Sequence, residues 1–267
     1  MIRLSSLPFF VFAMSASGAG DLYLLPERFT LAPGASCELG LHSGDFFPAS
    51  EYAFDPERIT RARWSNGTSI AGWRAEEVRT RADAKAPERA GSYIALLETV
   101  AERREMEADD FEAYLADEGA LDTLEWRSRQ GEGRKPGREM VRRYAKTLVT
   151  VGEPGSGVDR VAGHALEIVP LADPARLKAG EELALRVLYR GAPLRGLVVN
   201  ARWVDAAGRM GSLAAAPTDA RGRTSVKIEG AGRWKLHTLR LVRRLDRKEA
   251  DWDTYSASLT FETGGTQ

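Results

Sequence analysis

The stretch Trp234-Lys235-Leu236-His237-Thr238-Leu239-Arg240-Leu241 begins with strict alternation of apolar and polar residues. Successive side chains of a β-strand point to opposite faces, so Trp234 and Leu236 should face a core, and Lys235 and His237 the other side. Further segments of strand character surround it, separated by Gly, Pro and Asp residues that favour turns. These segments are residues 165–170, 182–189, 196–203, 224–229 and 255–261. Short strands at such even spacing predict an immunoglobulin-like β-sandwich over residues 164–263.

The preceding part of the chain also favours β-structure. Candidate strands include residues 22–25, 37–42, 58–64 and 92–100. The pattern then changes to apolar residues at helical spacing, which predicts a short helical insertion near residues 108–126. A run of Gly, Pro and Ser starts a predicted linker over residues 152–163. The predicted fold class is therefore mainly β, with two antiparallel β-sandwich domains, the first over residues 20–151 and ending with the helical insertion.

The N-terminus has the composition of an export signal. A basic start is followed by an apolar stretch over residues 4–16 and by the small residues 15–20. The apolar stretch is too short for a membrane span, which needs about 20 residues. This layout predicts a cleaved signal peptide over residues 1–19 and a periplasmic protein whose mature chain has no transmembrane span. The alternative is a buried N-terminal strand or helix.

Charge and cysteine content exclude several classes of function. The 38 basic and 38 acidic residues balance to a net charge of zero, which favours neither nucleic acid nor an anionic membrane as a partner. The single cysteine, Cys37, cannot form an internal disulfide, and its alternation with Leu39 and Leu41 predicts a buried, inert thiol. The sequence contains no G-x-S-x-G motif, and no catalytic residue is predicted.

Motifs spread along nearly the whole chain are similar to those of one family. Residues 111–119 match F-x-x-Y-L-x-x-E-G, and residues 166–174 match L-E-I-V-P-x-x-x-P. The remaining matching segments, in chain order, are residues 137–146 (G-R-E followed by R-Y-x-K), 191–194, 218–223, 232–237, 251–252 and 258–261. On these motifs the chain resembles the bacterial domain-of-unknown-function 4198 family.

The resemblance implies an exported protein, since the family is grouped with periplasmic components of cobalt and nickel uptake. It implies a divalent metal, nickel or cobalt, as ligand and a membrane metal-uptake system as partner. Members begin the mature chain with H-x-x-W-x-x-P, whereas this chain reads Gly20-Asp21-Leu22-Tyr23-Leu24-Leu25-Pro26. An imidazole suits these borderline ions, so its absence at Gly20 weakens the metal hypothesis.

The chain's three histidines, His42, His164 and His237, are the candidate metal ligands. They are far apart in sequence and lack H-x-H or H-x3-H spacing, so a site would have to assemble in space with Asp or Glu. The alternative is that all three are surface residues, with His237 on a solvated sheet face.

A basic cluster is the candidate site for an anion or an acidic partner. Its residues are Arg134, Lys135, Arg138, Arg142 and Arg143. Guanidinium groups bind carboxylates and phosphates through paired donors. The alternative is pairing within the chain, with the acidic segment that precedes the cluster.

Two functional hypotheses follow. The first is a non-catalytic periplasmic binding or accessory protein linked to nickel or cobalt uptake. The alternative is a cell-envelope interaction module that binds polysaccharide or a protein partner.

Overall fold

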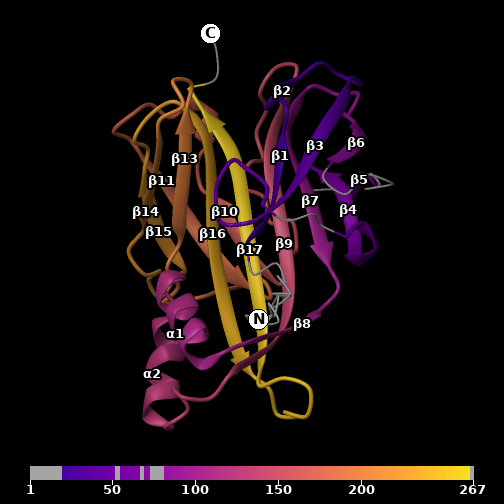
Figure 1. The fold of residues 1–267 in the computed structure, drawn as a ribbon. Coiled ribbons are helices and arrows are strands. Elements are labelled where there is room, and N and C mark those ends of the chain that lie inside the picture. Colours follow the sequence, from indigo (N-terminus) through magenta and orange to yellow (C-terminus); the bar gives the residue numbers. More distant parts are fainter. Residues whose placement is uncertain (1–19, 52–54, 67–68, 73–80, 265–267) are drawn as a thin grey trace, which may run out of the picture.

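The computed structural model describes residues 20–51, 55–66, 69–72 and 81–264, so the predicted signal peptide lies outside the described residues. The described chain is mainly β, with two α-helices at one end (Figure 1). The strands are β1 (Leu22–Pro26), β2 (Thr30–Leu31), β3 (Ser36–Ser43), β4 (Ile59–Ser65), β5 (Ser69–Gly72), β6 (Arg81–Lys85), β7 (Gly91–Thr99), β8 (Glu102–Met106), β9 (Gly137–Val151), β10 (Leu166–Pro170), β11 (Glu182–Tyr189), β12 (Ala192–Pro193), β13 (Asn200–Asp205), β14 (Met210–Ala214), β15 (Arg223–Lys227), β16 (Gly232–Arg243) and β17 (Trp252–Thr263). The helices are α1 (Ala108–Asp117) and α2 (Leu121–Arg129), with short 3-10 turns η1 (Pro56–Arg58) and η2 (Pro174–Arg176).

One large sheet organises the molecule. Its strand order is β14-β13-β16-β17-β9-β7-β4-β5, and β2 and β8 also pair with β9. A second sheet has the order β1-β3-β6, and a third contains β10, β11, β12 and β15. The described strands pair in antiparallel fashion, except that β9 pairs in parallel with β17 and with β2.

The large sheet is the middle layer between the two smaller sheets. On β7, Ile94 and Leu96 belong to the core shared with the four-stranded sheet, whereas Tyr93, Ala95 and Leu97 belong to the core shared with the three-stranded sheet. Alternate residues of a strand face opposite sides, so both faces of the large sheet are covered here. Both cores are fully apolar at their centres, as at Leu39 and Leu185, which are 0% exposed.

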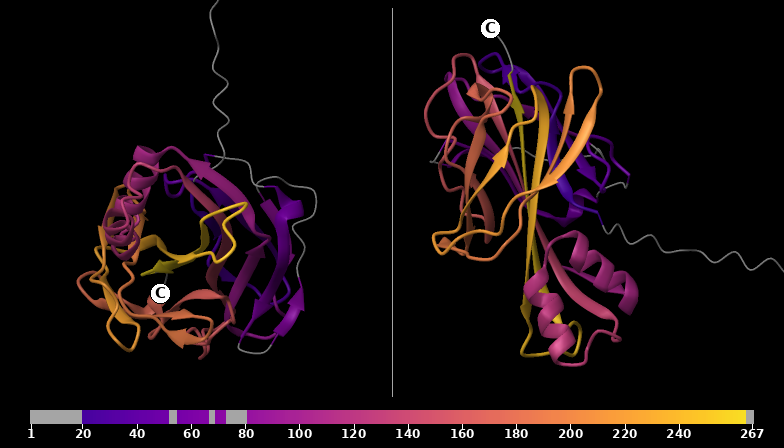
Figure 2. Two further views of the ribbon diagram at one scale, coloured as in Figure 1. Left: turned by 90° about the horizontal axis from the view of Figure 1, so that it is seen from below. Right: turned by 90° about the vertical axis from the view of Figure 1, so that its left-hand side faces the viewer.

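The two helices cover the far end of β16 and β17 (Figure 2). Phe111 and Leu115 lie one helical turn apart on α1, are fully buried, and pack with Leu239, Leu241 and Trp252. The four-residue spacing puts both side chains on one face of the helix, which explains why α1 docks on the sheet. No helix in the described ranges is long and apolar enough to cross a membrane.

The predicted fold class is confirmed: the protein is a β-sandwich with a short helical insertion. The predicted division at residues 152–163 stays a prediction. β9 and β17 come from the two predicted domains, yet they pair from Glu139–Trp252 to Thr147–Thr260 within one sheet. The parallel pairing was not expected, because the two strands are separated by more than 100 residues and no local pattern marks such a partner.

Candidate functional site

Three ionisable side chains meet on the polar side of the large sheet. One donor atom from each of Asp21, Glu118 and His237 lies within 4.8 Å of the other two. It is the sole such cluster of His, Cys, Asp or Glu side chains within the described part of the chain. Asp21 and His237 are buried and Glu118 is half-buried. We call these three residues the carboxylate–histidine cluster.

Asp21 is positioned by the strand that follows it. β1 pairs with β3 through its backbone, and it lies across hydroxyl groups of β17. The hydroxyl of Ser258 donates to the Leu22 carbonyl at 2.7 Å, and that of Thr260 donates to the Leu24 carbonyl at 2.5 Å. These alternate residues of β17 share one face, which holds the start of β1 beside β16.

Glu118 is positioned by the way α1 ends. The backbone N–H of Gly119 donates to the Ala116 carbonyl, and that of Ala120 donates to the Leu115 carbonyl. Gly119 has φ = 69°, a left-handed conformation that favours glycine. This is the Schellman arrangement, and it directs the side chain of the preceding residue, Glu118, toward the sheet instead of along the helix.

His237 and Lys235 are contributed by β16. They are two residues apart and therefore point to the same face of the sheet. Their side chains are 3% and 1% exposed, so the expectation that His237 lies on a solvated face is wrong. β1 and the end of α1 cover this polar face. The sequence of β16 itself contains no pattern that predicts this burial.

The imidazole of His237 lies between two carboxylates. Its Nδ1 atom is 2.9 Å from Glu118 Oε2, and its Nε2 atom is 3.0 Å from Asp21 Oδ1. Nε2 also lies 2.9 Å from the Ser256 hydroxyl oxygen. The second oxygen of Asp21 accepts a hydrogen bond from Lys235 Nζ at 2.8 Å. Both ring nitrogens of His237 and both oxygens of Asp21 thus have partners within the protein.

The electrostatics of the cluster follow from this arrangement. Burial alone would lower the pKa of His237, but the negative charges of Asp21 and Glu118 outweigh it and hold that pKa above its usual value. Burial alone would raise the pKa of Asp21, but His237 and Lys235 outweigh it and hold that pKa below its usual value. The opposite charges of Asp21 and His237 therefore stabilise each other.

The other two candidate histidines lie elsewhere. His42 is half-buried on β3, where its ring stacks on Tyr23 at 5.1 Å between centroids. His164 precedes β10 and is 3% exposed, so the expectation of a surface position is wrong for it. Burial, followed by the charge of Lys146, lowers the pKa of His164 to about 3, which keeps its imidazole neutral. Only His237 joins a group of possible metal ligands within the described residues.

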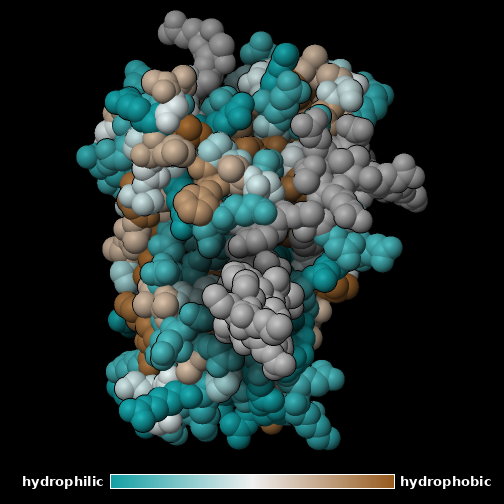
Figure 3. All heavy atoms as spheres, viewed as in Figure 1, coloured by the Kyte–Doolittle hydropathy of each residue, from teal (hydrophilic) through white to brown (hydrophobic). Residues whose placement is uncertain are grey.

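The basic cluster does not form one surface. Arg142 and Arg143 are adjacent on β9 and therefore point to opposite faces. Four of its five members lie beside carboxylates of the chain itself: Lys135 with Glu132 at 3.4 Å, Arg138 with Asp251 at 2.9 Å, Arg142 with Asp253 at 3.6 Å and Arg143 with Glu102 at 3.1 Å. The fifth, Arg134, is exposed. The molecule's helical end is mostly hydrophilic (Figure 3). An anion site at these residues stays a prediction.

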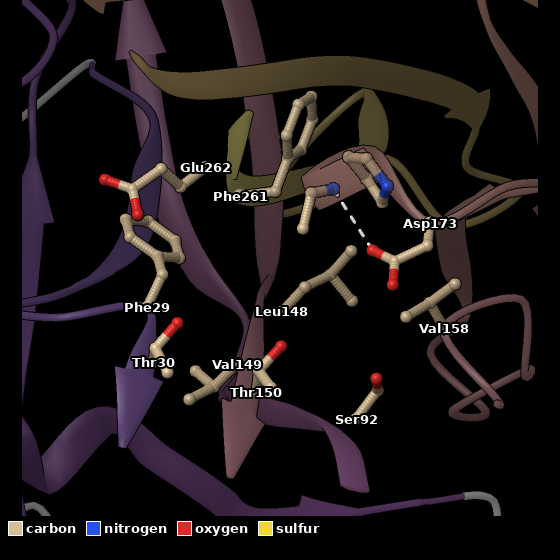
Figure 4. Close-up of a pocket in the computed structure, with 12 residues that line it drawn as sticks. Phe29, Thr30, Ser92, Leu148, Val149, Thr150, Val158, Asp173, Phe261 and Glu262 are labelled. Carbon is tan, nitrogen blue, oxygen red and sulfur yellow. Dashed lines mark hydrogen bonds between the residues drawn. The ribbon is translucent and has the colours of Figure 1, made fainter. Parts of the chain in front are cut away.

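Cavities also lie away from the carboxylate–histidine cluster, and two of them are lined by described residues. One, about 30 Å³, lies between sheet residues and Asp173, whose side chain accepts from the backbone N–H of Ala175 (Figure 4). It has room for a water or two, which is too little for a ligand. The other, about 530 Å³, is an open hollow at the helical end, where Arg127 and Arg138 already pair with Glu112 and Asp251. Neither brings together groups with unmet charge.

Fold and site together define a mainly β sandwich protein with a buried carboxylate–histidine cluster between a sheet and a covering strand. The chain belongs to the family described as Domain of unknown function (DUF4198), whose sequence profile matches residues 17–241. The match includes all three members of the cluster. Glu118 is the acid of the F-x-x-Y-L-x-x-E-G motif, and His237 ends the motif at residues 232–237, so these motifs were signals for the site that histidine spacing did not provide.

Comparisons with other known proteins add no functional information. No curated protein matches the chain. Among solved structures, trypsin-activated alpha-2-macroglobulin from Escherichia coli aligns with a TM-score of 0.27 and 11% identity, over 91% of this chain and 16% of that one. The D0-D1 domain of intimin aligns with a TM-score of 0.21 and 9% identity, over 89% and 96%. The Escherichia coli adhesin FdeC aligns with a TM-score of 0.22 and 12% identity, over 91% and 64%. Structural similarity this low supports no inference about the function of this protein.

Gly20 stands where the family resemblance implies a histidine, and there is little space for a side chain at this position. A Cβ atom at Gly20 would lie 2.3 Å from the Cα atom of Gly44. Real Cβ atoms do not approach a backbone so closely, so a side chain at this position would have to displace the loop after β3. Gly20 therefore suits the backbone packing beside Asp21.

Proposed function

We propose that the protein is a non-catalytic, periplasmic binding or accessory protein that holds a divalent transition-metal ion at the carboxylate–histidine cluster. The observation that carries this proposal is the convergence of donor atoms from Asp21, Glu118 and His237. These residues come from the position before β1, the end of α1 and the central strand β16. Imidazole and carboxylate groups are ligands that proteins use for such ions.

The residues present fit a metal, with distinct roles. Glu118 accepts from Nδ1 of His237, which would fix the ring and leave Nε2 for the ion. Ligating histidines are usually oriented in this way by a carboxylate on the other ring nitrogen. Nε2 and Asp21 Oδ1 lie 3.0 Å apart and would supply the first two ligands. An ion there would take the place of the Nε2 proton, as metal binding to imidazole requires.

The choice of metal rests on donor chemistry and on family. Imidazole with carboxylate suits nickel, cobalt and zinc better than magnesium or calcium, which prefer oxygen alone. The family's grouping with cobalt and nickel uptake favours nickel or cobalt among these. A membrane metal-uptake system is then the partner that would receive the ion.

Thermal unfolding of the full chain, with and without each metal, tests the proposal. A ligand at about 100 times its dissociation constant stabilises a fold by about 2.7 kcal/mol, which raises the melting temperature by several degrees. Ni²⁺ or Co²⁺ should raise the melting temperature of the wild type and of a His42→Gln control, but not that of His237→Gln.

The absence of a shift with Ni²⁺, Co²⁺, Zn²⁺ or Cu²⁺ would contradict metal binding. The polysaccharide or protein-partner hypothesis would then lead. An equal shift in His237→Gln would show that a metal binds at another site.

A further inference from the structure

Lys235 is an unusual neighbour for a metal site. Its side chain is 1% exposed, and its Nζ atom donates to Asp21 Oδ2 at 2.8 Å. The ammonium also lies 4.8 Å from the centre of the Tyr23 ring, whose face attracts a cation. A buried ammonium persists only with such partners. One oxygen of Asp21 is thus held by Lys235, while the other faces His237.

We propose that Lys235 is a built-in counter-cation: it stabilises the empty carboxylate–histidine cluster and competes with the metal for Asp21. This inference rests on the proposed metal function and concerns how tightly the site holds its ion. Competition from Lys235 makes the bound ion easier to release. Easy release suits a protein that transfers its metal to a partner, whereas a structural metal site needs tight binding.

The charges of the cluster support this role. Asp21 and Glu118 together carry two negative charges, and Lys235 supplies one positive charge within contact distance of Asp21. A divalent ion with a neutral imidazole would bring the buried group to a net charge of +1, whereas the same group without the lysine would be neutral. Two cations that share one buried carboxylate repel each other more strongly than in water, so the lysine must lower metal affinity.

Two neutral groups from neighbouring strands lie against Glu118 and His237. Asn200 on β13 donates to Glu118 Oε2 at 3.3 Å, and the Ser256 hydroxyl on β17 faces Nε2 of His237. Both groups are neutral. Two further charges act on Asp21 with opposite signs: Asp45, in the loop after β3, and Arg202 on β13. Lys235 is the cation in direct contact with the candidate ligand.

The test compares Lys235→Met with wild type by calorimetric titration of Ni²⁺, Co²⁺ and Zn²⁺ at one fixed pH. Methionine keeps the length and apolar stem of lysine and removes the charge. We expect at least tenfold tighter binding, and a lower melting temperature than wild type only when metal is absent. Lys227→Met is the matched control, because Lys227 is half-exposed on β15 in the four-stranded sheet and should change neither quantity.

The outcomes separate this inference from the proposed function. Metal binding by wild type with equal or weaker binding by Lys235→Met would overturn the counter-cation role and leave the metal site standing. Binding by neither protein would overturn both proposals. Binding by Lys235→Met at concentrations where wild type is empty would support the competition. Should Lys235→Met fail to fold, Lys235→Gln keeps a donor for Asp21 without the charge and should also bind at least tenfold more tightly.

Discussion

Glu118 Oε2 lies 2.9 Å from His237 Nδ1, although 119 positions separate the two residues. This contact joins the helical insertion to the central sheet and orients the histidine that lies between two carboxylates. It depends on the end of α1, on β16 and on the packing of Phe111 beneath the helix.

Glu118→Gln should weaken metal binding without unfolding the protein. Glutamine keeps the shape but removes the negative charge that orients the imidazole. Removal of such a carboxylate from behind a ligating histidine typically costs about 10- to 100-fold in affinity. Calorimetric titration with Ni²⁺ checks this. Glu125→Gln is the control, since Glu125 is exposed on α2 and pairs with Arg129; equal loss in both variants would contradict the assigned role.

Gly137→Ala should lower both the stability of the protein and its affinity for Ni²⁺, although Gly137 is not part of the carboxylate–histidine cluster. A Cβ atom there would lie 2.1 Å from the Phe111 ring, so α1 would have to shift. Overpacking of this kind costs about 1–3 kcal/mol of stability. Because α1 carries Glu118 at its end, Ni²⁺ affinity should fall as well. Urea unfolding and metal titration measure the two effects. Gly133→Ala, where the nearest contact is 3.9 Å, should leave both unchanged.

The buried pair of Glu167 and Lys146 should make the protein acid-sensitive. Their side chains are 0% and 1% exposed and lie 2.8 Å apart, and three backbone N–H groups at residues 162–164 also donate to the carboxylate. Burial would raise the pKa of Glu167, but Lys146 and these donors outweigh it and hold the pKa below its usual value of about 4.3.

The unfolded chain therefore binds this proton more readily than the folded one. The carboxylate's contribution is complete above about pH 5 and is lost as the pH falls through the lowered pKa. Glu167→Gln should lose about 3 kcal/mol at pH 7, because it leaves Lys146 buried without its partner. Denaturant unfolding between pH 3 and 7 should show a smaller loss on acidification in the variant; equal pH dependence would contradict the role of Glu167.

The single cysteine should resist alkylation in the native protein. Cys37 is 2% exposed, and burial, with Glu27 and Glu38 nearby, raises the pKa of its thiol to about 11. At pH 8 the thiol is then both inaccessible and protonated. Iodoacetamide followed by mass spectrometry should label Cys37 only after unfolding. Rapid labelling of the native chain would contradict a buried, inert thiol.

Export should remove the first residues of the chain. In a bacterial host, the periplasmic fraction should contain a protein whose mass corresponds to cleavage after Gly18 or Ala19. Phe10→Arg places a charge within the apolar stretch and should leave an uncleaved protein in the cytoplasm. Uncleaved wild-type protein in the cytoplasm would contradict the predicted signal peptide.

Part of the candidate site could be read from local pattern. The alternation around Trp234 and Leu236 correctly placed His237 on the face opposite the core that contains these two residues. The same pattern could not show that β1 covers His237. Alternation specifies which side chains share a face, but burial of a polar face depends on a strand about 210 residues away in the sequence.

The sequence by itself determined the mainly β class, the helical insertion and the family, because periodicity, turn residues and ordered motifs are local signals. Only the tertiary structure decided that β9 and β17 share one sheet and that Asp21, Glu118, Lys235 and His237 meet. Those contacts join segments that are distant along the chain. Their energies come from burial and from pairing of charges, which depend on what packs above a residue and not on its neighbours in sequence.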